Sequence, residues 1–209
     1  MERREPQTPQ GETTRILVEF LEVAVNSIVF LKGVYPSGAF ERRRYMNVVV
    51  HKARHPQLKE YIHSTVTALQ PFIQKGVVET VAVVFFNKDN IPIEKFVFNL
   101  KVNQLSGLRV EEIDLMFSLR SFLMKLSVSE PLTKGLPPGC RWEITAHFRT
   151  LPEPNSTTKE ADIWIPTDTQ QWQQPPLITP IKSMSSEPVS LQLYLQHSNF
   201  SEPTPTPKN

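Results

Sequence analysis

Two pairs of residues in this chain have side chains that could bind a metal ion or catalyse a reaction. In both pairs the sequence context or the spacing argues against such a site. His51 and His55 stand four residues apart, a spacing at which two histidines on a helix bind one metal ion. Pro56 follows the second, however, and the segment is typical of a strand and then a loop, without a carboxylate or cysteine to complete a site. Cys140 and His147 could act as thiol and base, but residues seven apart on one strand point to opposite faces. Two surface histidines and an unpaired thiol are the favoured interpretation.

Other motifs of catalysis are missing from the sequence. It has no Gly-rich phosphate loop, no His-Glu-x-x-His zinc motif, no nucleophile elbow and no Cys-x-x-Cys pair. Asp89 belongs to a Lys88-Asp89-Asn90 turn, where aspartate serves the backbone. We therefore predict that the protein is not an enzyme and uses no cofactor or metal ion. An unrecognised hydrolase is the weakest alternative, because no nucleophile and base can be placed together.

The composition fits one globular domain. The chain has 209 residues, of which 39% are hydrophobic and 21% charged, and a formal charge of +2 that demands neither a nucleic-acid nor a membrane partner. The one dense basic run, Arg42-Arg43-Arg44, either contacts phosphate or an acidic partner or is a solvated loop, and the solvated loop is favoured. A single cysteine and an N-terminus, MERREPQTPQGE, without an apolar signal region indicate an intracellular protein. Charges within 17–34 make that apolar stretch too short to span a bilayer.

Hydrophobic periodicity predicts three helices. The first begins after Thr13 or Thr14 as N-cap, is apolar on most sides and ends at Gly33 and Pro36. The second runs from His55-Pro56 to Gly76, and Pro71 kinks it or ends its regular part. The third, about 110–127, carries two apolar stripes: Leu115, Leu119, Phe122 and Leu126, and then Ile113, Met116, Phe117, Leu123 and Met124, with Arg120 among the second set. Deep burial and contact with another chain explain the second stripe equally well.

The strands come between and after these helices. Tyr45 to Val50 is suited to a short strand, and VVETVAVVFFN and IPIEKFVFNLKV predict a β-hairpin whose second arm has an uncertain register. CRWEITAHFRT alternates apolar and polar residues, as a half-solvated antiparallel strand does. The order predicts an α+β fold, with helices packed on one face of a mainly antiparallel sheet.

The last third of the chain has a different composition. Thirteen of the nineteen prolines lie from Pro131 onward, so no long helix fits there. Apolar residues that favour burial nevertheless recur: Ile163, Trp164, Ile165, Trp172, Leu177, Ile178, Ile181, Leu191, Leu193, Tyr194 and Leu195. An extended segment that docks on the first part and ends in a strand added to the sheet satisfies both features. Such a segment suits the capture of an extended peptide by strand addition.

Five stretches in this order, FLEVAVNSIVFLKGVYPSGAFERRRYMN, HPQLKEYIHSTV, PIEKFVFNL, LPPGCRWEI and PIKSMSSEPVSLQLYL, resemble the HORMA-domain family. Within it they are most similar to the accessory subunits of translesion DNA polymerase zeta. The resemblance implies one HORMA domain over 13–197, with a core at 13–150 and a C-terminal "safety belt" at 151–197. Residues 1–12 would form a flexible tail, and 198–209 a disordered Pro-rich tail.

The resemblance also implies a non-catalytic nuclear adaptor, present also in the cytoplasm, in DNA damage tolerance. The belt, which has open and closed arrangements, would lock a Pro-containing peptide of the polymerase zeta catalytic subunit against the sheet. A second surface would bind the C-terminal domain of a deoxycytidyl-transferase scaffold polymerase. Pairing with another HORMA domain and remodelling by a AAA+ ATPase are further implied, and no small-molecule ligand or membrane is expected.

Matched residue by residue, the family pattern implies three groups of site residues. Tyr35, Tyr61 and Trp164 would bind the partner peptide, with Trp172 a rival for the belt tryptophan; Ile178, Gln192 and Tyr194 would meet the scaffold polymerase; Arg120 and, less clearly, Arg42 would lie at a homotypic interface. The segment 152–176 departs most from the family pattern, being rich in Gln and Thr. Two alternatives stay open: a HORMA adaptor of a spindle-checkpoint or meiotic chromosome assembly, and a nucleic-acid binder that uses Arg42 to Arg44.

Overall fold

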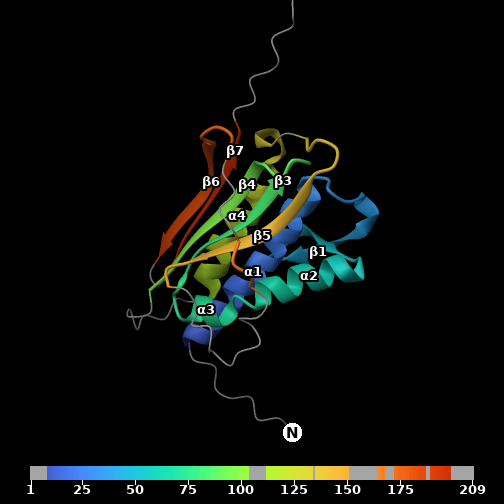
Figure 1. Cartoon of the computed structure of the whole chain (residues 1–209). Helices are drawn as coiled ribbons and strands as arrows, with labels where there is room; N and C mark the ends of the chain where they lie inside the picture. The colour runs from blue at the N-terminus through green and yellow to red at the C-terminus, as the bar shows by residue number, and fades with distance from the viewer. Residues whose placement is uncertain are drawn as a thin grey trace, which may run out of the picture.

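The computed structural model describes residues 9–103, 112–133, 135–150, 164–167, 172–186 and 189–198. Its helices are α1 (Pro9–Leu31), η1 (Ser37–Ala39), α2 (Pro56–Thr67), α3 (Gln70–Gln74), α4 (Glu112–Ser127) and η3 (Glu130–Leu132). Its strands are β1 (Phe40–Tyr45), β2 (Val48–Ala53), β3 (Val78–Phe86), β4 (Pro92–Val102), β5 (Arg141–Phe148), β6 (Leu177–Ser186) and β7 (Val189–His197). An antiparallel sheet in the order β5-β3-β4-β7-β6 carries α1 and α4 on one face (Figure 1), which confirms the α+β prediction.

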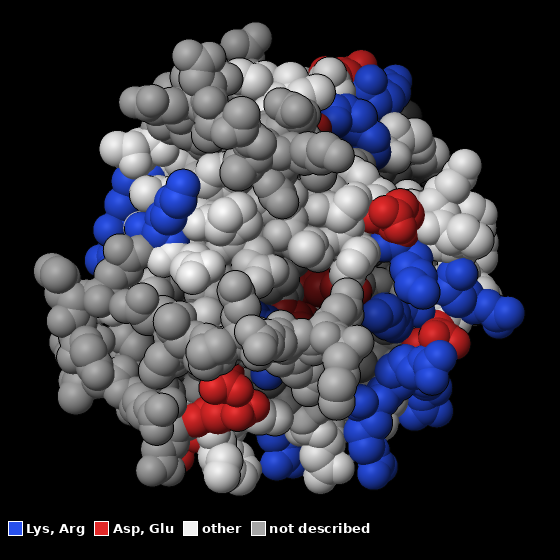
Figure 2. Space-filling model, turned by 90° about the horizontal axis from the view of Figure 1, so that it is seen from below, with Lys and Arg blue, Asp and Glu red and all other residues white. Residues whose placement is uncertain are grey.

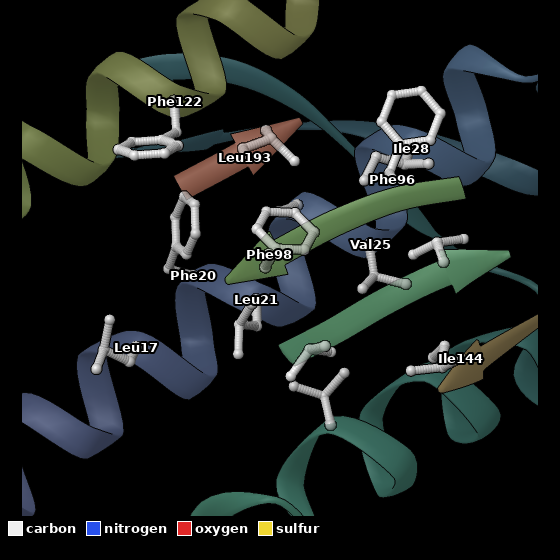
Figure 3. Close-up of a cluster of buried hydrophobic side chains, with 14 of the residues drawn as sticks. Leu17, Phe20, Leu21, Val25, Ile28, Phe96, Phe98, Phe122, Ile144 and Leu193 are labelled. Atoms are coloured by element: carbon white, nitrogen blue, oxygen red, sulfur yellow. The ribbon is translucent and has the colours of Figure 1, made fainter. Parts of the chain in front are cut away.

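Helix α1 is the centre of the main core. Phe20 is fully buried and meets Phe98 of β4 and Phe122 of α4 edge to face, with ring centroids 6.2 Å and 6.0 Å away (Figure 3). The apolar character on most sides of this helix is therefore explained by contacts with the sheet and with three other helices. No helix among the described residues is long and apolar enough to cross a membrane.

The predicted start of α1 is wrong, and its predicted end is right. The helix begins at Pro9, so Thr13 and Thr14 lie inside it, and Thr14 is buried rather than capping. Proline is well suited to a first turn because its missing amide would have no helical partner there. At the other end the helix stops at Leu31, and Gly33 takes a left-handed conformation with φ 62°.

A hairpin replaces the single strand predicted at Tyr45 to Val50. β1 pairs with β2 in antiparallel register, and Tyr45 lies opposite Val48. Met46 and Asn47 between them both have positive φ, 46° and 59°, as a two-residue type I′ turn requires. Methionine is not a usual residue at such a position, which is why the turn was missed.

Proline positions divide the second predicted helix as expected. Pro56 stands at the start of α2, and the chain breaks before Pro71 into the short helix α3. The predicted β3–β4 hairpin is also present, with Asn87 Oδ1 accepting hydrogen bonds from the amides of Asp89 and Ile91 at 2.9 Å. In β4 the side chains of Phe96, Phe98 and Leu100 join the main core, while Val97 packs in a second cluster with Ala82, Val84 and Phe86. This alternation settles the uncertain phase of the second arm.

The C-terminal hairpin of β6 and β7 completes the sheet. β7 pairs with β4 along its whole length, and β6 follows outside it, so the predicted strand added to the sheet is confirmed. Leu191, Leu193 and Leu195 are buried against the core, whereas Leu177 and Ile178 are 46% and 61% exposed, against expectation. These two residues lie on the outermost strand, where no further strand covers them.

Candidate functional site

Strand β5 forms one edge of the sheet, and its backbone alternates between facing β3 and facing outward. The amide of Arg149 donates to Val77 O at 2.8 Å, toward β3, whereas the amide of Ile144 donates to the hydroxyl of Tyr61 at 3.3 Å. In an antiparallel strand the N–H and C=O of one residue point the same way, and the direction alternates. Trp142, Ile144 and Ala146 therefore present their backbone groups outward, where an added strand could pair.

Aromatic side chains lie beside this outward-facing edge. Trp142 Nε1 donates to the hydroxyl of Tyr35 at 3.1 Å, and its ring meets that of Tyr61 edge to face with centroids 5.4 Å apart. Tyr35 and Tyr61 come from the loop after α1 and from α2, and each keeps about two fifths of its surface exposed, 38% and 40%. The two predicted peptide-binding tyrosines are thus brought to one place by a third aromatic residue.

Trp142 was not among the predicted site residues. The alternation of CRWEITAHFRT assigned it correctly to the same face as Ile144 and Phe148, but that pattern alone indicates a core position. In the structure Trp142 is only half-buried, because it lies near the end of an edge strand. Its position at the strand end, with a tyrosine-bearing helix nearby, was the signal that could have found it.

The far end of the same strand meets the belt tryptophan. Phe148 contacts the ring of Phe72 at 5.2 Å and that of Trp164 at 6.1 Å, both edge to face. The indole Nε1 of Trp164 is buried and has no hydrogen-bond partner in the described part of the chain. Trp142 and Phe148 are six residues apart, so the aromatic wall extends about 20 Å along β5.

The belt differs from expectation beside Trp164. Ile165 is 82% exposed rather than buried, and Ile163 lies outside the described residues. Of the two tryptophans, only Trp164 packs against the main core among the described residues, while Trp172 is half-buried elsewhere. Trp164 is therefore the tryptophan that the structure brings to β5.

Two opposing effects act on the pKa of the Tyr61 phenol. Burial raises its pKa, and the Ile144 amide, which donates to the phenol oxygen and favours the phenolate, lowers it in part. The tyrosine is thus neutral at physiological pH. Its hydroxyl satisfies one outward amide of the β5 edge.

The second predicted group lies on the other face of the sheet. Tyr194 of β7 packs against the cluster of Ala82, Val84, Phe86 and Val97, and burial raises its pKa. Gln192, two residues earlier on the same strand, shares this face and is exposed, and Ile178 stands two residues before Pro180, the β6 partner of Tyr194. The structure therefore brings Ile178, Gln192 and Tyr194 to one face of the β6–β7 hairpin.

The third predicted group is divided between α4 and the small hairpin. The second stripe of α4 is largely exposed, with Ile113 at 63%, Phe117 at 62% and Met124 at 51%, although Leu123 is buried. Arg120 is half-buried within this face, and its Nε is buried without a hydrogen-bond partner in the described residues. Arg42 is exposed on β1, whose neighbour β2 contacts α4.

The side chains first considered for metal binding or catalysis make contacts that are typical of structural residues. His51 stacks on Phe30 with centroids 3.5 Å apart, and His147 Nδ1 lies 3.1 Å from Thr80 Oγ1. Burial raises the pKa of the Cys140 thiol, the opposite of what a nucleophilic cysteine requires. No group of three or more His, Cys, Asp or Glu side chains within the described ranges could hold a metal ion.

Comparisons with known proteins identify the family. Residues 14–135 match the family model of the HORMA domain. The chain is 59% identical over 200 residues to the DNA polymerase zeta processivity subunit of Arabidopsis thaliana, with 96% of this chain and 93% of that protein covered. It is 35% identical over 192 residues to the human mitotic spindle assembly checkpoint protein MAD2B, with 87% and 89% covered.

Solved structures give the same fold. A chain of the mitotic checkpoint complex superimposes with a TM-score of 0.73 at 17% identity, covering 88% of this chain and 97% of that one. Caenorhabditis elegans HTP-2 bound to HTP-3 closure motif 1 gives 0.72 at 10% identity, with 91% and 87% covered. At these identities the likeness is one of fold alone.

Proposed function

The chain belongs to the HORMA-domain family, and we propose from this premise that it is a non-catalytic adaptor subunit of DNA polymerase zeta. The names of its relatives, a processivity subunit and a checkpoint protein, agree with the prediction that it is not an enzyme. In the proposal it captures a Pro-containing peptide of the polymerase zeta catalytic subunit along β5. The proposed role is in DNA damage tolerance, with the nucleus as the proposed location and the cytoplasm as an additional one.

One observation carries the proposal: the outward-facing backbone of β5 beside Tyr35, Tyr61 and Trp142. An extended peptide pairs with such an edge through its main chain and places alternate side chains on the aromatic wall. The peptide's own carbonyl would take over the Ile144 amide from the Tyr61 hydroxyl. The exchange costs little, because one hydrogen bond replaces another.

The arrangement of the C-terminal segment supports capture at β5 and not elsewhere. The β6–β7 hairpin is paired with β4, at the opposite side of the sheet from β5. Trp164, which lies between β5 and β6 in the sequence, packs against Phe148 of β5. A peptide on β5 would therefore lie beneath the belt, the closed arrangement of this family, and Trp164 would close over it.

Further contacts complete the adaptor. The face with Ile178, Gln192 and Tyr194 would bind the C-terminal domain of the scaffold polymerase, so that the two polymerases are bridged. The exposed apolar face of α4 with Arg120, together with Arg42, would pair with a second HORMA domain. A AAA+ ATPase would reopen the belt for release.

The test is calorimetry of the full chain with a synthetic peptide series that spans the catalytic subunit's accessory-binding region. Tyr61→Ala combined with Trp164→Ala should abolish the heat of binding while the melting temperature shows a folded protein. Tyr194→Ala serves as matched control: it should keep peptide binding and lose the scaffold polymerase's C-terminal domain. Peptide affinity that is unchanged in the double variant would refute capture at β5.

A second function is favoured by the name of the human relative, a spindle assembly checkpoint protein. The same β5 edge would then hold a peptide of a checkpoint or chromosome-axis protein. Affinity purification with mass spectrometry separates the two: a large B-family polymerase among the recovered proteins supports the first function, and only spindle or axis proteins would support the second.

A further inference from the structure

A basic hollow lies away from β5, between α1, the β1–β2 hairpin and α2. It has a volume of about 330 Å³, and its charged lining consists of Glu22, Glu41, Arg43, Arg44, Lys52 and Lys59. None of these residues belongs to the aromatic wall of β5. We call it the hairpin groove.

The surroundings of the hairpin groove concentrate the positive charge of the molecule. Residues 40–60 hold six Lys and Arg residues against two Glu, a net charge of +4, so the remainder of the chain carries −2 out of the total of +2. Figure 2 shows Lys and Arg side chains gathered on one side of the face seen from below, the side on which the β1–β2 hairpin lies in Figure 1. A nearly neutral protein therefore has one strongly basic surface.

Internal acids neutralise only part of this charge. Arg43 is paired with Glu41 at 2.7 Å, and Lys52 with Glu22 at 3.3 Å. Arg42, Arg44, Arg54 and Lys59 form no ion pair with any described residue. Folding has thus brought cations from two strands and a helix together with fewer acids than bases, and the repulsion among the unpaired cations would be relieved by a bound polyanion.

The lining favours phosphates over an acidic peptide. Tight peptide docking relies on a few apolar anchors in desolvated pockets. The apolar side chains of the lining, Val23, Tyr45 and Val50, are half-buried or buried, and none of the large exposed hydrophobic residues of the described chain belongs to it. The four arginine and lysine side chains of the lining match the phosphodiester backbone, whose binding is electrostatic and independent of base sequence.

We propose that the hairpin groove binds the backbone phosphates of duplex DNA, through Arg44 and Lys59 of its lining and the exposed Arg42 and Arg54 of the same chain segment. This goes beyond peptide capture, and it uses none of the residues assigned to that role. The contact is non-specific in sequence. It would hold the accessory subunit, and whatever it captures, near the template.

The test is fluorescence anisotropy of the full chain with a labelled 20-base-pair duplex over a series of salt concentrations. Binding in the range of about 10⁻⁴ to 10⁻⁶ M is expected near physiological salt. Four cations that each neutralise one phosphate would give a slope of log K against log salt of about −3 to −4. Arg44→Gln with Lys59→Gln should reduce that slope by about 2 and weaken binding at least tenfold at about 50 mM salt.

A matched control removes the same charge elsewhere. Lys101→Gln with Lys125→Gln changes two exposed lysines on β4 and α4, outside the hairpin groove, and should leave the slope within experimental error of the unaltered chain. Melting temperature and peptide capture verify that each variant is folded. Equal losses in both double variants, an absence of salt dependence, or tighter binding of poly-glutamate than of DNA at equal charge would each overturn the proposal. Failure here would leave peptide capture intact, because the two are measured separately.

Discussion

The two edges of the main sheet are built in opposite ways. β5 is paired with β3 through its central residues without a shift in register, and its outer side meets aromatic side chains. β6 carries Pro180 and a register shift between Pro180 and Lys182, beside exposed Leu177 and Ile178. Proline, lysine and irregular pairing are the features by which proteins stop an edge from adding a further strand. The contrast indicates that one edge is kept available for pairing and the other is blocked.

The largest effect should come from removing one outward amide of β5. Ala146→Pro takes away an N–H that faces away from β3, so the sheet keeps its own hydrogen bonds while an incoming peptide loses one and meets the proline ring. We expect peptide affinity to fall at least 100-fold in calorimetry. Thr145→Pro is the matched control: its amide faces β3, and this variant should unfold. Normal binding by Ala146→Pro would show that the peptide does not pair with β5.

A smaller effect is expected when the blocked edge is opened. Pro180→Val restores an amide and a residue of high β-propensity on β6. We expect self-association that rises with protein concentration, measured by light scattering after gel filtration against the unaltered chain. An identical mass for both proteins at every concentration would mean that features other than Pro180 block this edge.

Removing the hydroxyl of Tyr61 distinguishes the contribution of its ring from that of its hydrogen bond. Tyr61→Phe keeps the ring against Trp142 and removes the oxygen that accepts from Ile144. The free energy of unfolding should fall by about 0.5–1.5 kcal/mol, the net value of one hydrogen bond. Peptide affinity should stay within about threefold, since the peptide supplies its own acceptor; a loss as large as that of Tyr61→Ala would assign the role to the hydroxyl instead.

The smallest effect concerns pH, through His147 of β5. Burial, and secondarily the charge of Lys95, lowers the pKa of His147 below its usual 6.5. The unfolded chain then binds a proton that the folded one resists, so stability is complete above pH 6.5 and is lost as pH falls through and below that value. Denaturant unfolding at pH 7.5 and 5.5 should show this loss, and His147→Gln should reduce it. An equal loss in the variant would assign the acid sensitivity to other groups.

Local patterns predicted much of the fold because they depend on near neighbours. Pro56 and Pro71 fixed the ends of α2 because of the missing amide of proline, and the β3–β4 hairpin followed from two apolar arms around a polar turn. The Met46-Asn47 turn was missed because one of its two positive φ angles belongs to a residue that rarely adopts one. The prediction for Ile165 failed for another reason. Its hydrophobicity predicted burial, but only some apolar side chains of a belt segment pack against the core, and Ile165 stays exposed.

The amino-acid sequence by itself determined the main helices apart from the start of α1, the main hairpin, the alternating strand β5, the lack of the known catalytic motifs and the resemblance to the HORMA family. Only the tertiary structure decided that the C-terminal hairpin pairs with β4, that Trp142 joins Tyr35 and Tyr61, and that Lys59 of α2 shares a hollow with Arg44 of β1. The physical reason is distance along the chain. Periodicity predicts which side of a helix or strand is apolar. Which strand edge or helix that side contacts depends on packing between segments far apart in sequence.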